Sequence, residues 1–265
     1  MTNGGSDGFG AAATWHHGLV ARWWALFRHD GPEIAFFRRF VAAGEPALDV
    51  GCGTGRLLVP YVRDGLDVDG ADASADMIDH CRAAASAVGA APNLYVQPAH
   101  ELDIDRSYST VLMCGTFGVG SIDGQDAAGL ERIRAHLAPG GTFVMDYETA
   151  EHWTPRIAPD TGAPPPGSER QRGPDGDEYA LRQRVVAVDD SGRQVRREMH
   201  AWRWHDGELV GDERHVLTYV RYRPGEIVDL LGRAGFVDVS VIGGYDGTTP
   251  TPQHAFLVYV ARTPS

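Results

Sequence analysis

The 265-residue sequence contains no lysine, and all 24 of its basic residues are arginine. Without lysine the chain can form no internal Schiff base with pyridoxal phosphate and has no P-loop lysine for the phosphates of a nucleotide. Its formal net charge is −12 at pH 7, and the arginines are spread along the chain. Because such a chain repels a polyanion, we expect a small-molecule substrate and no nucleic-acid partner.

Cysteine is scarce, and long apolar runs are missing. Cys52, Cys81 and Cys114 are an odd number at wide spacings, which argues against a disulfide framework and against a thiolate metal site. No apolar run has the length of a membrane span, and residues 1–10 lack the basic and apolar regions of a signal peptide. We therefore expect a cytoplasmic protein without a membrane partner, with one main domain and an accessory element.

A glycine-rich turn follows the first buried strand. The stretch over residues 47–58 predicts a short strand, a tight turn and the start of a helix. Gly51, Gly53 and Gly55 lack a Cβ atom, so the backbone there can approach a ligand closely and leave the helix amides accessible. Asp49 stands at the strand end, where its carboxylate can accept hydrogen bonds from a cationic or amine-bearing ligand.

A second strand, over residues 66–72, ends in Asp72, roughly 20 positions after the first glycine of the turn. An acid at that distance can bind both hydroxyls of a ribose. The alternative is that Asp72 only caps the helix that begins near Ser74. Because the acid accompanies a glycine turn, we favour the ribose-binding interpretation.

These motifs resemble those of class I S-adenosylmethionine (SAM)-dependent methyltransferases. Residues 49–55 are similar to the D-x-G-x-G-x-G string of motif I, residues 70–78 to the G-x-D-x-S-x-x-M segment, and residues 137–144 to the L-x-P-G-G-x turn before the fifth strand. The resemblance covers roughly residues 45–150 and 224–262. It implies an α/β Rossmann-like fold, with a mainly parallel seven-stranded sheet and helices on both faces, and SAM as cofactor, with S-adenosylhomocysteine as product.

The same resemblance implies which residues contact the cofactor. Asp72 would bind the ribose and Met77 would pack near the adenine. The family usually has an acid after the third strand, but no Asp stands there in this chain, so the backbone near Ala99 and His100, or the side chain of Glu101, would take its place. The expected cofactor-binding set is Asp49, Gly51, Cys52, Gly53, Gly55, Asp72, Ala73, Met77, Ala99, His100 and Cys114.

The remaining segments predict an elaborated domain. Residues 148–179 are rich in Pro, Gly and charge and predict a loop or lid. Residues 179–188, 193–204 and 208–223 are strand-like and separated by turn signals, so they predict a three-stranded antiparallel insertion. The expected organisation is a helical segment over the active site (1–44), the SAM-binding core (45–150), a loop and antiparallel insertion acting as substrate lid or dimerisation element (151–223), and a helix and hairpin completing the sheet (224–265).

The position of the insertion resembles small-molecule methyltransferases of natural-product pathways, especially amino-sugar N-methyltransferases. Methyl transfer mainly requires that donor and acceptor are aligned and water is excluded, and a general base helps some acceptors. Tyr147, Glu148 and His152 follow the fifth expected strand, at the edge where α/β proteins bind ligands, and His17 lies in an aromatic N-terminal segment. The expected catalytic candidates are therefore His152, Glu148, Tyr147 and His17, with Glu148 a partner for a substrate amine.

Other interpretations remain open at this point. A SAM-binding protein that does not methylate, either a cyclase or a regulator, would carry the same motifs. A nicotinamide-dependent oxidoreductase is disfavoured because Arg56 stands where the dinucleotide fingerprint has its third glycine. No metal is expected, because His200 and His205 have opposite strand parity and His215 lies on another strand. The acceptor atom, O, N or C, stays undetermined, and the insertion could support a homodimer.

Overall fold

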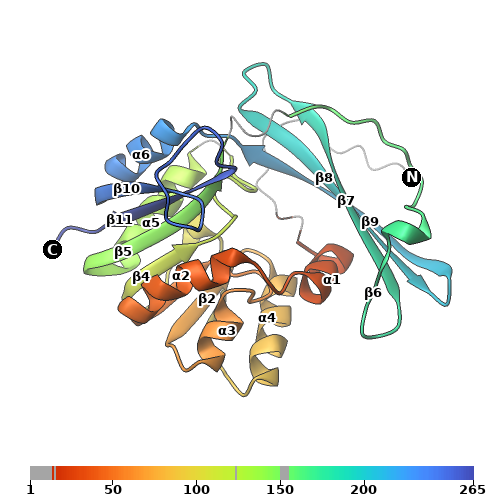
Figure 1. Cartoon of the computed structure of the whole chain (residues 1–265), viewed down its shortest axis with the longest axis horizontal. Helices are drawn as coiled ribbons and strands as arrows, with labels where there is room; N and C mark the ends of the chain where they lie inside the picture. Colours follow the sequence, from red (N-terminus) through yellow and green to blue (C-terminus); the bar gives the residue numbers. More distant parts are fainter. Residues whose placement is uncertain (1–13, 15, 123, 150–154) are drawn as a thin grey trace.

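The computed structural model describes residue 14 and residues 16–122, 124–149 and 155–265, which form two sheets and the helices that pack on them (Figure 1). The larger sheet has seven strands in the order β10-β11-β5-β4-β1-β2-β3. The pairs among β1 to β5 are parallel, whereas β11 pairs antiparallel with both β5 and β10. Its strands are β1 (Ala47–Val50), β2 (Val68–Asp72), β3 (Leu94–Val96), β4 (Tyr108–Met113), β5 (Leu137–Glu148), β10 (Val237–Gly243) and β11 (Phe256–Arg262).

Both faces of this sheet are covered. Alternate residues of β4 divide between two apolar clusters, with Val111 and Met113 in one and Leu112 in the other. The first cluster contains buried residues of α5 and α6, and the second contains those of α2, α3 and α4. Such near-continuous burial is typical of a parallel sheet between helical layers. The helices are α1 (Gly18–Phe27), α2 (Pro32–Ala43), α3 (Leu58–Arg63), α4 (Ala75–Ala87), α5 (Gln125–His136) and α6 (Pro224–Arg233), with 3-10 turns η1 (Ala99–Glu101) and η2 (Gly167–Glu169).

The smaller sheet is antiparallel and has the strand order β6-β7-β8-β9. It comprises β6 (Gln171–Arg172), β7 (Glu178–Val188), β8 (Gln194–His205) and β9 (Glu208–Val220). The sequence predicted three strands here. The fourth was missed because β6 has only two residues, in a stretch whose composition indicates a loop, and forms by pairing across a tight turn with Glu178 and Tyr179.

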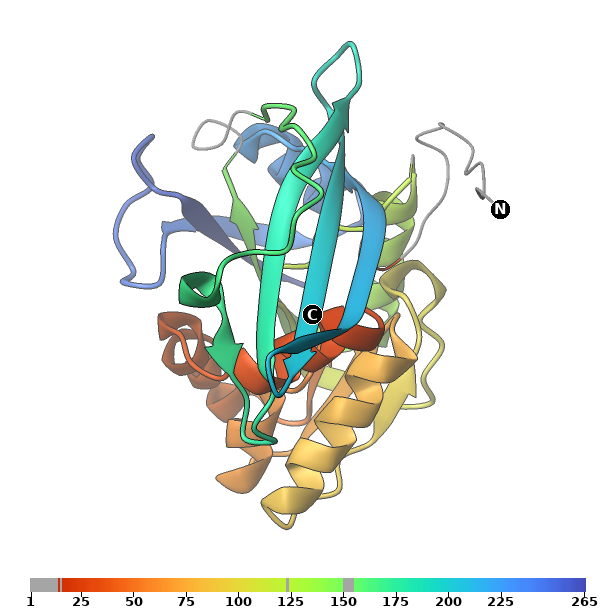
Figure 2. The same ribbon diagram turned by 90° about the vertical axis from the view of Figure 1, so that its right-hand side faces the viewer.

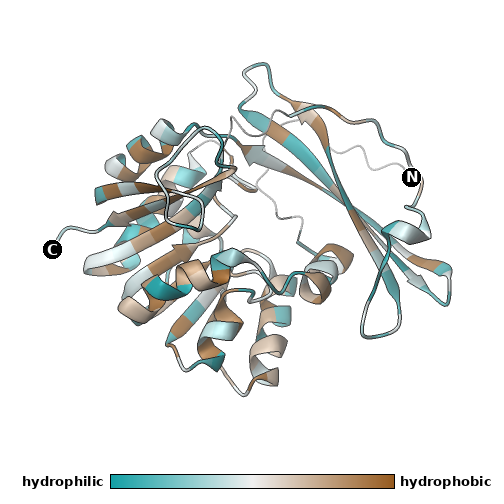
Figure 3. Cartoon of the chain, in the orientation of Figure 1, coloured by the Kyte–Doolittle hydropathy of each residue, from teal (hydrophilic) through white to brown (hydrophobic). Residues whose placement is uncertain are grey.

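Helix α1 joins the two sheets. Figure 2 shows it crossing one end of the long antiparallel strands, and it also contacts α4. Its buried residues Leu19, Val20 and Trp23 pack with Met199 of β8 and Leu217 of β9. Figure 3 shows the parallel strands coloured largely hydrophobic and the hairpin loops of the antiparallel sheet hydrophilic. The predicted α/β fold with an antiparallel insertion is therefore confirmed.

Candidate active site

A cavity of about 560 Å³ lies at the carboxyl ends of the parallel strands. Its wall follows the ends of β1, β2, β3 and β4, where backbone turns leave room for a ligand in this class of fold. Residues from outside the parallel sheet close it, namely Trp24 of α1, Leu217 of β9, and Thr14, His16 and Arg28 beside α1. The cavity is thus shared between the core, the N-terminal segment and the insertion.

The glycine turn forms part of this wall. Gly51 and Gly53 line the cavity with positive φ angles of 76° and 55°. A Cβ atom on Gly51 would lie 2.6 Å from Cγ2 of Thr116, so a larger residue is excluded by space as well as by conformation. Gly55 does not line the cavity. A Cβ atom there would lie 2.8 Å from Sγ of Cys81, so its role is close packing of the turn against α4.

Asp72 lies on the cavity wall and is bonded to the glycine turn. Its Oδ2 accepts the backbone N–H of Gly53 at 2.9 Å, and its Oδ1 accepts that of Ser74 at 2.8 Å. The N-cap of α4 is Ser74 itself, whose hydroxyl accepts the backbone N–H of Met77 at 3.2 Å. Burial raises the pKa of the Asp72 carboxyl above its ordinary value. The alternative in which Asp72 only caps the helix is therefore wrong.

Asp49 is the most deeply buried acid of the cavity wall. It is 2% exposed, and no residue in the part of the chain that the structure describes forms an ion pair with it. Burial, followed by the charges of Asp72 and Asp146, raises the pKa of Asp49 to about 7. A buried carboxylate without a counter-ion gains most from a cationic ligand, so this position suits an ammonium group.

The segment after β3 forms the other end of the cavity. Ala99, His100 and Glu101 all line it, together with Ala73 and Met77. The side-chain amide of Gln125 lies 3.0 Å from Nε2 of His100, which connects this segment to α5. All three positions that the sequence offered in place of the usual acid thus lie on the wall.

Cys52 and Cys114 also line the cavity, but neither has the character of a nucleophile. Burial raises the pKa of Cys114 far above its ordinary value, so its thiol stays protonated. Its Sγ donates to Oδ2 of Asp146 at 3.1 Å and lies 3.6 Å from Nη2 of Arg56. Arg56, which also lines the cavity, forms an ion pair with Glu33 of α2.

The predicted catalytic residues are not gathered at the cavity. Tyr147 is buried beside it in the apolar core, where its hydroxyl donates to the carbonyl of Val220 at 3.1 Å and accepts the N–H of Tyr222 at 2.9 Å. Glu148 ends β5, two strands away from β1, and does not line the cavity. His17 is exposed and His152 lies outside the described residues. Tyr147 thus joins β5 to the end of the insertion.

The sequence did not single out several residues of the cavity wall. Trp24 and Arg28 are four positions apart on and just after α1, so they share one side of that helix. The Arg28 guanidinium lies 5.6 Å from the ring centre of Trp24. Phe117, which follows β4, also lines the cavity, and its ring centre lies 5.3 Å from that of Tyr222. No short motif marks Trp24 and Arg28, because the packing of α1 brings them to the cavity.

The histidines of the insertion lie elsewhere. Nε2 of His200 is 2.6 Å from Oδ1 of Asp212, and Nδ1 of His205 is 2.6 Å from Oδ1 of Asp177. Among the described residues, no group of three or more His, Cys, Asp or Glu side chains is arranged to hold a metal ion, and metal independence stays a prediction. Within the same residues, no helix is long and apolar enough to cross a membrane.

Comparison with known proteins agrees with this geometry. A family model described as a methyltransferase domain matches residues 47–141, which span β1 to the start of β5. No curated protein matches the sequence significantly. The resemblance to methyltransferases found in the motifs is thereby confirmed for the α/β core.

Solved structures share the fold over most of the chain. A SAM-dependent methyltransferase from Clostridium acetobutylicum has a TM-score of 0.70 at 17% identity, covering 92% of this chain and 97% of its own. The sugar N-methyltransferase KedS8 from a Streptoalloteichus species has a TM-score of 0.70 at 20% identity, covering 100% and 99%. SAM-bound CalS10 from Micromonospora echinaspora, an amino pentose methyltransferase of calicheamicin biosynthesis, has a TM-score of 0.63 at 20% identity, covering 91% and 94%.

Proposed function

We propose that this chain, whose core is a methyltransferase domain, binds SAM in the cavity and transfers its methyl group to a small-molecule acceptor of secondary metabolism. The observation that carries the proposal is the joint placement of the glycine turn, Asp49 and Asp72 on one cavity wall. Asp72 is positioned for the ribose hydroxyls, because its carboxylate faces the cavity and already orders the turn through Gly53. Asp49 is the acid for the ammonium group of the methionine moiety.

The α-carbon that bears this ammonium group also bears a carboxylate, for which Arg28 is the available cation on the cavity wall. The side chain of Arg28 forms no hydrogen bond or ion pair with another described residue, and its guanidinium lies against the rings of Trp23 and Trp24. Arg56 is already paired with Glu33. A zwitterionic ligand would therefore meet a negative and a positive side chain in one cavity, which supports SAM over a ligand of a single charge.

The acceptor side supports a small molecule. Trp24, Phe117 and Leu217 close the cavity with apolar surface, which suits a compact ligand shielded from water. The similarity to a sugar N-methyltransferase and to an amino pentose methyltransferase supports an acceptor of the natural-product kind. In this proposal residues 1–44 and 151–223 cover the acceptor, residues 45–150 and 224–265 form the core, and the protein acts in the cytoplasm, with the insertion available for a homodimer.

When bound, SAM supplies an electrophilic methyl group on a sulfonium. The contribution of this chain is then to hold donor and acceptor in line and to exclude water. Asp49, Asp72 and Arg28 fix the donor, and the apolar cover formed by Trp24, Phe117 and Leu217 confines the acceptor. No covalent intermediate with the protein is needed, which agrees with the protonated state of Cys114.

Calorimetric titration with SAM, S-adenosylhomocysteine and NAD, each added separately to protein freed of copurified ligand, tests the proposal. Micromolar binding of the first two without NAD would support it. Methyl-labelled SAM would then be offered with a panel of amino sugars, phenols and enolisable ketones. Label transfer with accumulation of S-adenosylhomocysteine supports methyl transfer, whereas product without S-adenosylhomocysteine would support the cyclase alternative. Folded protein that binds none of the three ligands would contradict the proposal.

A further inference from the structure

Two adjacent histidines precede α1, and the structure separates them. His16 lines the cavity, whereas His17 is exposed and does not. His17 is the N-cap residue of α1, with extended backbone angles of −124° and 162°, and its ring centre lies 6.1 Å from that of His215. Only the first of the pair can therefore contact a ligand in the cavity.

The segment that carries His16 is anchored from both sides of the cavity. The hydroxyl of Ser74, at the start of α4, donates to the carbonyl of His16. One residue beyond His17, the N–H of Gly18 donates to Oδ2 of Asp76 at 2.7 Å, and the next N–H, of Leu19, donates to Oε2 of Glu213 at 2.8 Å. Because α4 begins beside the ribose acid and Glu213 belongs to β9, these bonds fix His16 between the cofactor wall and the insertion.

The surroundings of the ring keep the imidazole neutral. Its Nδ1 lies 3.3 Å from Oγ1 of Thr14, and the ring meets Trp24 edge-on with centres 5.7 Å apart. Burial, with a smaller contribution from His17, lowers the pKa of His16 to about 4. A neutral imidazole has one nitrogen that accepts a hydrogen bond, and it is a weak base that would not suffice to remove a proton from carbon.

We propose that His16 is the acceptor-binding residue of this site, and that the acceptor is an amine or a hydroxyl whose N–H or O–H donates to the imidazole. This inference rests on the proposed methyltransferase function. The hydrogen bond would direct the lone pair of the acceptor atom toward the methyl group. As the bond from that atom to the methyl carbon forms, the bond from carbon to sulfur breaks, the sulfonium becomes a neutral sulfide, and the proton lost by the acceptor passes to solvent.

Sinefungin tests the inference before any acceptor is known. This analogue carries an amine where SAM carries the sulfonium methyl, whereas S-adenosylhomocysteine has no donor there. We expect His16→Ala to weaken sinefungin binding at least about fivefold, equivalent to about 1 kcal/mol, and to change S-adenosylhomocysteine binding less than about twofold. His29→Ala, which removes an exposed histidine that does not line the cavity, is the control and should leave both affinities unchanged. His16→Gln, whose amide oxygen can accept the same hydrogen bond, should recover part of the sinefungin affinity and guards against an effect of misfolding.

Kinetics with an acceptor found by label transfer give the second readout. His16→Ala should lower kcat/KM for an amine or hydroxyl acceptor at least about tenfold, with the SAM dissociation constant unchanged, while His29→Ala stays near wild type. Equal sinefungin and S-adenosylhomocysteine responses in His16→Ala and wild type would overturn the role of His16 and leave the proposed function standing. Wild-type protein that binds neither analogue would instead overturn the proposed function. A carbon-methylated product would overturn the acceptor class.

Discussion

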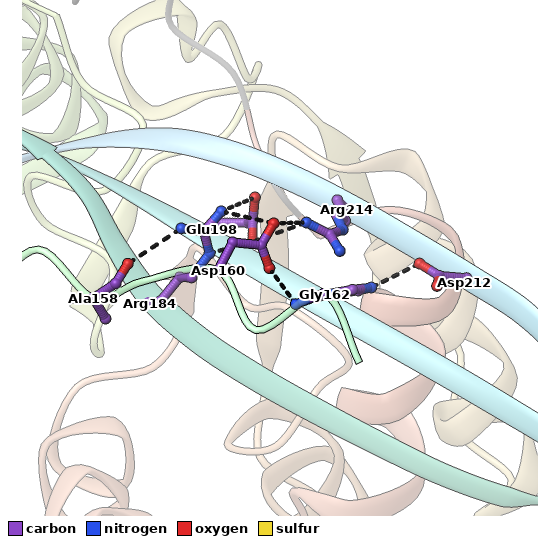
Figure 4. Close-up of polar contacts among 8 residues, drawn as sticks. Ala158, Asp160, Gly162, Arg184, Glu198, Asp212 and Arg214 are labelled. Atoms are coloured by element: carbon purple, nitrogen blue, oxygen red, sulfur yellow. Dashed lines mark hydrogen bonds and ion pairs between the residues drawn. The ribbon is translucent and has the colours of Figure 1, made fainter. Parts of the chain in front are cut away.

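The carboxylates at the carboxyl ends of the parallel strands and those around the antiparallel sheet differ in their ion pairs and in the direction of their pKa shifts. Asp49 is buried and Asp72 is half-buried, neither forms an ion pair with a described residue, and desolvation raises the pKa of each. On the antiparallel sheet, Glu198 accepts two hydrogen bonds from Arg184, at 2.7 and 3.0 Å, and Asp160 pairs with Arg214 at 2.5 Å (Figure 4). The hydrogen bond from Arg214 lowers the pKa of Asp160.

This difference separates ion pairs that stabilise the fold from acids that have no ion pair within the described residues and are available to a ligand. The arginine pairs of the antiparallel sheet connect β7, β8 and β9 to the segment around residues 158–162 and are complete within the chain. Asp49, which is buried without an ion pair to a described residue, is costly in the free protein when ionised, and a cationic ligand would relieve that cost. The two sheets should therefore respond differently when a carboxylate is removed.

The largest effect is expected on stability, from the antiparallel sheet. Glu198→Ala would leave Arg184 partly buried without its bidentate partner, so we expect the free energy of unfolding to fall by about 3 kcal/mol. Urea denaturation measures this. Glu169→Ala, which removes the half-exposed partner of Arg182, should cost less than about 1 kcal/mol. SAM affinity should be unaffected by either change, and equal losses of stability would contradict the comparison.

Removing the carboxylate of Asp49 is expected to raise the free energy of unfolding instead of lowering it. Because its pKa is about 7 in the folded chain and near 4 when unfolded, the folded state holds an extra proton between those pH values, and its stability falls as the pH rises through that range. Asp49→Asn does not ionise. It should be more stable than wild type by about 2 kcal/mol at pH 8, and nearly equal at pH 4.

Thermal unfolding at both pH values measures the change in stability, and SAM titration at pH 8 measures the change in affinity. We expect the Asp49→Asn protein to melt higher and to bind SAM more weakly, since it lacks the charge for the ammonium group. A variant that is less stable than wild type at pH 8 would show that Asp49 is compensated in a way the structure does not indicate.

A smaller effect is expected at the ribose position. Asp72→Ala should raise the SAM dissociation constant at least about tenfold, equivalent to about 1.4 kcal/mol. Asp79→Ala, on the exposed side of α4 and paired only with Arg82, is the matched control and should bind SAM like wild type. Unchanged affinity in Asp72→Ala, measured by calorimetry, would remove this residue from the site.

The smallest effect concerns the cation of the cavity. Arg28→Ala should weaken SAM binding about fivefold, or about 1 kcal/mol, because Arg28 lies at the exposed end of the cavity. Binding of methylthioadenosine, which lacks the amino-acid group, should not change. The exposed Arg39 of α2 provides the control substitution, Arg39→Ala. Parallel loss of both ligands in Arg28→Ala would mean that the arginine supports the cavity structurally instead of binding the carboxylate.

The sequence predicted the parallel half of the site and missed most of the other half for a physical reason. Asp49, the glycines and Asp72 lie in turns directly after strands, so local spacing places them on one edge of the sheet. Trp24 and Leu217 reach the cavity only because α1 packs on a distant sheet. No spacing rule encodes that contact.

The predicted catalytic residues show the same limit at shorter range. Choosing between His16 and His17 depends on where α1 begins, and element boundaries are the least reliable part of a sequence prediction. Tyr147 lies near the carboxyl end of β5, as expected. Its hydroxyl is hydrogen-bonded to the backbone of Val220 and Tyr222. Position along a strand predicted its location and could not predict its partners.

Ser74 is bonded to both halves of the site at once. Its N–H donates to the carboxylate of Asp72, and its hydroxyl donates to the carbonyl of His16. A displacement of Asp72 or of the His16 backbone would therefore be transmitted to the other through Ser74. Thermodynamic linkage makes such coupling mutual. If a bound donor changes the affinity for the acceptor by some factor, a bound acceptor changes the affinity for the donor by the same factor. In the proposed methyltransferase, the affinities for donor and acceptor would then depend on one another instead of being independent.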